Sequence, residues 1–172
     1  IKMKKTLIAA LPVLTLMLPT AAPAQDIVVS YKSLVSVLSG YHGIPDADYW
    51  GRLAPESTRA ALIRMADDPE VFTLMRARAL RALAYFANDE VSAFLSSKAK
   101  NDSVAYMRSS AYEALAIANS AEAVSILEEG LKDRDVIVRL TAARTLGAIG
   151  TPTAVKALER GLATEKNATA RS

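Results

Sequence analysis

The sequence has no cysteine among its 172 residues. Disulfides, thiolate metal sites and the lipid-bearing cysteine of a bacterial lipoprotein are therefore excluded within this sequence. Aromatic residues are scarce, at 6%, and the only histidine is His42. Because a metal site or a catalytic triad needs several imidazole or thiolate groups, the sequence indicates no metal, no cofactor and no catalytic residue.

A long apolar run is present only near the beginning, where residues 1–24 resemble a secretory signal peptide. Lysines come first, Thr6–Leu18 is apolar, and Ala22–Ala24 has the small-residue form of a cleavage site. Pro12 and Pro19 interrupt a run that is already short for a membrane span. We therefore expect cleavage, no membrane insertion afterwards, and a bacterial protein that is periplasmic or secreted.

An excess of charge is also lacking once this segment is removed. The sequence holds 21 basic and 18 acidic residues, and three of the lysines lie within residues 1–24, which contain no acid. The remaining chain therefore has 18 residues of each sign. A neutral chain has no broad attraction for nucleic acid, and no glycine-rich nucleotide-binding motif is present. We expect no nucleic-acid partner.

What the sequence does contain is a repeat. Around Arg139, small and apolar residues occur at helical spacing within Asp133–Gly150 (DRDVIVRLTAARTLGAIG). Similar stripes surround Arg108 and Arg76, at intervals of 31 and 32 residues, and an acidic residue precedes each arginine by six positions. Such a period predicts stacked helical hairpins, each with a first helix (A) and an arginine-bearing second helix (B).

The hairpins define the expected elements. We expect A-helices at 55–66, 90–100, 120–132 and 152–163, and B-helices at 70–87, 103–118 and 135–149. Residues 25–54 are expected to form an N-terminal helical cap, with one helix over 25–40, and residues 166–172 a frayed polar tail.

The run D-x-D-x-x-V-R-x-x-A-A-x-x-L-G-x-I-G at Asp133–Gly150 resembles a HEAT repeat of the short bacterial type, the PBS-lyase HEAT-like repeat. The resemblance implies an all-α fold, an α-solenoid of about three repeats over residues 55–165. It also implies a non-enzymatic scaffold or adaptor with a protein partner. By analogy with the family, each repeated arginine would bind an acidic side chain of a turn, or a backbone carbonyl, and so hold adjacent hairpins together. The residues expected to act as these structural anchors are Arg76, Arg108, Arg139, Asp102 and Asp133.

The exposed side of the B-helices is the expected binding surface. It mixes charge with tyrosine, which suits a protein partner better than a phosphate backbone, although a merely solvated face is the alternative. The candidate protein-binding residues are Arg78, Arg81, Tyr85, Tyr112, Glu113 and Arg144.

Two further interpretations remain open. An aromatic group in the N-terminal cap either packs that cap or forms a ligand pocket of the chromophore-lyase kind; its members are Tyr41, His42, Tyr49 and Trp50. Alternatively, the solenoid self-associates end to end through its last helix, at 152–163.

Overall fold

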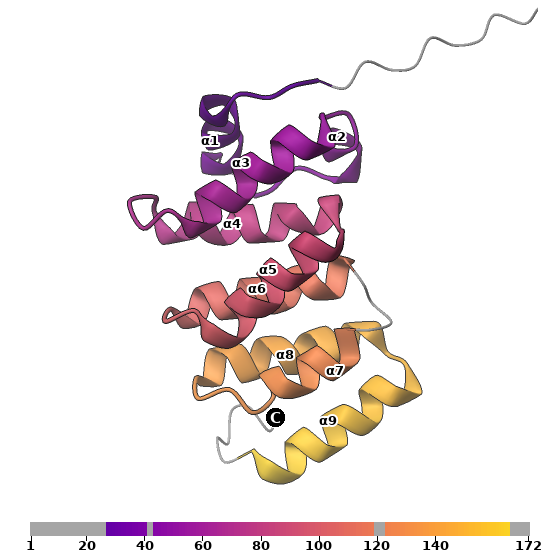
Figure 1. Cartoon of the computed structure of the whole chain (residues 1–172). Coiled ribbons are helices and arrows are strands. Elements are labelled where there is room, and N and C mark those ends of the chain that lie inside the picture. Colours follow the sequence, from indigo (N-terminus) through magenta and orange to yellow (C-terminus); the bar gives the residue numbers. More distant parts are fainter. Residues whose placement is uncertain (1–26, 41–42, 119–122, 166–172) are drawn as a thin grey trace, which may run out of the picture.

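The computed structural model describes residues 27–40, 43–118 and 123–165, and in these ranges the chain is helical apart from short connections (Figure 1). The helices are α1 (Tyr31–Ser39), α2 (Ala47–Trp50), α3 (Pro55–Asp67), α4 (Thr73–Leu83), α5 (Asp89–Asn101), α6 (Ala105–Ala118), α7 (Ala123–Gly130), α8 (Val136–Ile149) and α9 (Pro152–Thr164), with a short 3-10 turn after α4 at Ala84–Phe86. The predicted all-α solenoid is confirmed.

The helices form two layers. The A-helices α3, α5, α7 and α9 lie on one side of the stack and the B-helices α4, α6 and α8 on the other (Figure 1). Each B-helix packs against the next B-helix more extensively than neighbouring A-helices pack against each other. The B-layer is therefore the more tightly packed of the two.

Local sequence explains where the helices begin and end. The Asp135 carboxylate accepts a hydrogen bond of 2.8 Å from the backbone N–H of Ile137, and Asn88 caps α5 in the same way. Thr151 caps α9 ahead of Pro152, which occupies the first helical position. Gly150 ends α8 with a φ of +63°, a left-handed conformation that glycine adopts without steric cost.

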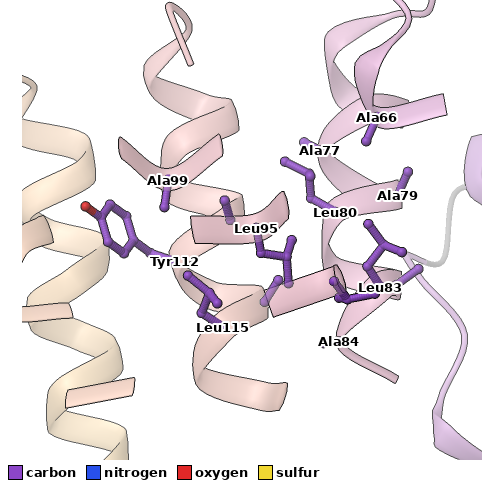
Figure 2. Packing of buried hydrophobic residues seen from close by; sticks show 14 of the residues in the cluster. Ala66, Ala77, Ala79, Leu80, Leu83, Ala84, Leu95, Ala99, Tyr112 and Leu115 are labelled. Carbon is purple, nitrogen blue, oxygen red and sulfur yellow. The ribbon is translucent and has the colours of Figure 1, made fainter. Parts of the chain in front are cut away.

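Small and large side chains alternate through the core (Figure 2). Ala79, Ala111 and Ala142 are fully buried, one on each B-helix, and they allow the helices to approach closely. Leucines four positions later fill the space between the layers; these are Leu83, Leu115 and Leu146. The period in the sequence is thus a period in packing.

The N-terminal cap differs from the expected helix over 25–40. The backbone N–H of Ile27 donates to the Arg52 carbonyl at 3.0 Å, and that of Ala54 donates to the Ile27 carbonyl at 2.9 Å, so Ile27 and Leu53 form an isolated parallel bridge. A run of β-branched residues, Ile27–Val29, favours this extended conformation. The helix begins only after Ser30, whose hydroxyl caps α1.

The last helix is covered on one side only. Leu95 and Leu127 are fully buried, whereas the equivalent Leu158 of α9 is half-buried. Val155 and Leu162 are 45% and 53% exposed. This difference arises because no helix follows α9 within the described part of the chain; the expected frayed tail, 166–172, lies outside it.

Among the described residues, every helix is too short or too polar to cross a membrane.

Candidate functional site

A groove of about 790 Å³ runs across the ends of the B-helices. Three charged side chains line it, one from each B-helix: Arg81, Glu113 and Arg144. The rest of the lining is mostly apolar and includes Ile44, Ala116, Ile117, Ala148 and Ile149. The groove therefore combines a charged row with a hydrophobic floor.

The repeat places the charged row. Arg81, Glu113 and Arg144 each lie five residues after an anchor arginine, so the stacking of equivalent helices brings them side by side. Ile117 and Ala148 follow Glu113 and Arg144 by four residues, which is about one helical turn or 5.4 Å along the axis. The apolar floor thus lies one turn beyond the charges, and the Ile117 side chain is 53% exposed.

Only part of the charge in the groove is neutralised. Arg81 Nη1 lies 3.4 Å from Glu113 Oε2, and Arg81 Nη2 donates to the hydroxyl of Tyr106 at 3.2 Å. The exposed side chain of Arg144 makes no hydrogen bond or ion pair with the residues that the structure describes. Within the described residues, the row therefore carries one positive charge without a partner.

Three other residues expected on this face lie elsewhere. Tyr112 is 3% exposed and belongs to the core, because a residue four positions after the anchor faces the adjacent hairpin (Figure 2). It lies against Gly130, where a Cβ atom would come within 3.1 Å of the ring. Burial, followed by the nearby Asp133 and Glu129 charges, raises the pKa of Tyr112 to about 12.

Arg78 is occupied by the N-terminal cap. Its Nη1 donates to the carbonyls of Leu38 and Gly40, at 2.6 and 2.8 Å, at the end of α1. These carbonyls would otherwise lack a helical partner. Arg78 thus holds α1 onto α4, and its contribution to a binding surface stays a prediction.

The aromatic cap is a packed cluster around Trp50. Tyr49 and Phe86 meet the indole edge-on, with ring centroids 5.1 and 5.9 Å away, and Tyr85 stacks on it at 6.2 Å. Trp50 is 1% exposed, and its Nε1 donates to the Pro45 carbonyl at 2.9 Å. The cluster therefore occupies Tyr85 as well as Tyr49 and Trp50. Tyr41 and His42 lie outside the described residues.

Two anchor arginines join successive hairpins through equivalent bonds. Arg108 donates from Nε and Nη2 to the two carboxylate oxygens of Asp133, both at 2.8 Å, and from Nη1 to the Asp102 carbonyl at 2.9 Å. Arg139 pairs in the same way with Glu165, at 2.7 and 3.0 Å, and with the Asp133 carbonyl at 2.9 Å. Such two-pronged pairs fix geometry as well as charge.

The environment of Asp133 favours its ionised form. Burial opposes ionisation, but hydrogen bonds from Arg108 and from the backbone N–H of Asp135 outweigh it, so the pKa of Asp133 lies below its ordinary value. The same bond with Asp133, opposed by burial, raises the pKa of Arg108. Both groups therefore stay charged at neutral pH.

The first anchor departs from this pattern. Arg76 Nε donates to the Ala66 carbonyl at 3.1 Å, within its own hairpin. The Asp102 carboxylate is instead approached by Lys98, which also binds Asp67 at 2.5 Å. Residues 68–72 connect α3 to α4, whereas the connection between α5 and α6 is shorter, at 102–104.

The sequence analysis did not predict that Lys98 and Glu165 take part in the ion pairs between hairpins. Glu165 could have been found, because it follows Asp133 by 32 residues, the interval of the repeat. Lys98 had no such signal, because its role depends on the atypical first turn.

The described residues contain no group of three histidine, cysteine or carboxylate side chains arranged to hold a metal ion. Comparison with known proteins gives one match: a family model of HEAT repeats matches residues 115–172, the segment from the end of α6 onward. No curated protein and no solved structure matches the chain.

Proposed function

We propose that this chain, a HEAT-repeat protein, is a non-enzymatic scaffold or adaptor that binds another protein through the groove on its B-helices. HEAT repeats generally serve as protein-interaction scaffolds. The observation that supports the site is the groove itself, where exposed apolar side chains lie beside a partly neutralised charged row. Protein interfaces commonly combine apolar and arginine contacts in this way.

The same proposal places the protein outside the cytoplasm of a bacterium, in the periplasm or secreted. Support comes from residues 1–24, whose basic, apolar and small-residue segments follow the order of a signal peptide. A partner would then be sought in the cell envelope.

A ligand pocket in the aromatic cap has less support than the groove. Three aromatic rings cover Trp50, whose ring nitrogen already has a partner within the chain. An indole so enclosed contributes to packing and offers little surface to a ligand.

The test is a pull-down from an extract of the envelope of the source cells, with residues 25–172 as bait. The test variant combines Arg81→Glu, Glu113→Lys and Arg144→Glu. The matched control combines Lys100→Glu, Glu129→Lys and Arg160→Glu, which change the net charge equally but lie on the A-helices. Circular dichroism confirms that both variants are folded.

A protein captured by the wild type and the control, but lost with the test variant, supports the proposed site. A protein captured equally by all three overturns the groove as the binding surface. Failure of the wild type to retain any envelope protein contradicts the adaptor function.

A further inference from the structure

We infer that the partner presents to the groove an acidic segment, a carboxylate flanked by aliphatic side chains, with the carboxylate on Arg144. This inference rests on the proposed protein-binding function and adds the chemistry of the partner. Three independent features support it: the charge balance, the quality of the ion pair, and the position of the apolar side chains.

The charge balance of the groove is positive. Of its three charged residues, Arg81 and Glu113 form an ion pair, whereas Arg144 has no partner among the described residues. No ion pair within 4.0 Å joins Glu113 to Arg144 in the described part of the chain. A guanidinium with five donors beside an apolar floor is suited to a carboxylate, which it can bind through two parallel hydrogen bonds.

The ion pair that is present is weak by the standard of this molecule. Arg108 and Arg139 bind carboxylates through two bonds of 2.7 to 3.0 Å. Arg81, in contrast, reaches Glu113 through one contact of 3.4 Å, and its buried Nε has no hydrogen-bond partner in the part of the chain that the structure describes. Among the described residues the groove therefore has one cation without a partner, Arg144, while its single carboxylate is already approached by Arg81. This asymmetry favours an acidic over a basic segment.

The apolar side chains set the spacing within that segment. Ala148, which lines the groove, lies one helical turn after Arg144. With a rise of 1.5 Å per residue, this position is about 6 Å from Arg144 along α8. An extended segment rises about 3.3 Å per residue, so its aliphatic side chains should lie about two residues from the acid.

A phosphate backbone or a lipid headgroup would fit this site poorly. A single arginine without a partner among the described residues, next to the negative Glu113, gives the groove only a weak positive potential. Binding to nucleic acid depends on neutralising many phosphates at once. The aliphatic contacts on Ile117 and Ala148 would also remain unused by a phosphate chain.

The experiment is selection from a random 12-residue peptide library displayed on phage, against immobilised residues 25–172. Parallel selections use Arg144→Glu and, as a matched control, Arg134→Glu, which reverses an exposed arginine outside the groove. The enriched peptides are then synthesised, and their affinities are measured by fluorescence anisotropy at low and high salt.

We expect the wild type and Arg134→Glu to enrich aspartate or glutamate about two residues from aliphatic side chains. The affinity of these peptides should fall at least about tenfold with Arg144→Glu, and also with added salt, as expected for a charge-assisted contact. The Arg144→Glu selection should instead enrich lysine or arginine at the same position.

Three results would overturn the inference, and they are distinguishable. Peptides that lack an acid, bind Arg144→Glu as well as the wild type, and lose affinity with Ile117→Asp would leave the groove as the binding site but remove the acidic partner. If no peptide is enriched over phage without an insert, or if the enriched peptides ignore both Arg144→Glu and Ile117→Asp, the inference and the groove itself are both contradicted. A single-stranded oligonucleotide that binds as tightly as the selected peptides also contradicts it.

Discussion

Arg108 and Asp133 show how one side chain can hold two hairpins together. Arg108 is 2% exposed and makes four hydrogen bonds, two of them to Asp133 in the turn of the next hairpin. A buried ion pair adds little to the stability of the fold compared with apolar residues of similar size. Removal of one member, however, leaves a buried charge uncompensated. The pair therefore specifies how adjacent hairpins stack.

We expect Asp133→Ala to lower the free energy of unfolding by about 3–5 kcal/mol, the usual cost of leaving one buried charge unpaired. Urea denaturation followed by circular dichroism measures the loss. The control is Glu128→Ala, which breaks an exposed pair with Arg160 and should change stability little. Equal effects of the two variants would mean that the buried lock does not stabilise the stack.

The same residue predicts a pH dependence. Because folding lowers the pKa of Asp133, its contribution to stability is complete above the ordinary aspartate pKa of about 4 and is lost as the pH falls through the lowered folded value. Melting temperatures measured from neutral to acid pH should therefore converge for the wild type and Asp133→Asn. A gap between them that persists at the lowest pH would contradict the ionic role.

Tyr112 predicts a loss of stability at the opposite end of the pH range. Its pKa is raised from about 10 in the unfolded chain to about 12 in the fold, because burial opposes the phenolate. Stability is thus unaffected below pH 10 and decreases as the pH rises from about 10 towards 12. Tyr112→Phe should show a smaller alkaline decrease in melting temperature than the wild type, and identical decreases would contradict this assignment.

At the scale of helices, two glycines have opposite surroundings. A Cβ atom at Gly130, the last residue of α7, would lie 3.0 Å from the Ala142 Cβ and 3.1 Å from the ring of Tyr112. At Gly147, within α8, a Cβ atom would meet nothing within 4 Å. The first glycine allows a close approach of hairpins, and the second only weakens its helix.

We therefore expect Gly130→Val to destabilise the fold by about 1–3 kcal/mol through overpacking. Gly147→Ala should stabilise it by about 0.5–1 kcal/mol, because alanine loses less backbone entropy in a helix. Thermal and urea unfolding of the two variants measure both effects. Changes of the same sign would contradict the assigned difference in packing.

Helix ends were the most predictable elements, since caps depend on neighbouring residues. Asp46, Asp135, Thr151 and Gly150 all lie at helix ends, where residues of these types commonly act as caps. The start of α1 was not predicted, because Ile27 pairs with backbone near Leu53. A contact between residues so far apart in the sequence leaves no periodic signal.

At the scale of the whole molecule, stability should vary along the stack. α6 packs against α4, α5, α7 and α8, whereas α9 packs only against α7 and α8 among the helices in extensive contact. In a solenoid, stability is roughly the sum of repeat and nearest-neighbour terms, so the end helix should open most readily.

Hydrogen exchange should therefore show the slowest amide exchange in α6 and much faster exchange in α9. Peptide-level mass spectrometry resolves the two helices. Equal protection would indicate that α9 is covered, for instance by the end-to-end self-association considered from the sequence, and sedimentation at increasing protein concentration would then test that explanation.

The repeat, the order of A- and B-helices and the register of the anchor arginines can all be read from the amino-acid sequence. These features follow from local rules: an apolar period of 3.6 residues, capping at helix ends, and an interval of 31 or 32 residues that must place equivalent side chains side by side. The same interval aligns Arg81, Glu113 and Arg144 across three helices.

Which neighbours of this row are exposed depends on how the helices pack. Tyr112 and Glu113 are adjacent in sequence, yet one is buried against Gly130 and the other lines the groove. Successive residues on a helix point about 100° apart, so a boundary between buried and exposed faces can fall between them. Where it falls depends on the helices packed to either side, and Arg78 shows the same dependence, because the end of α1 occupies its guanidinium.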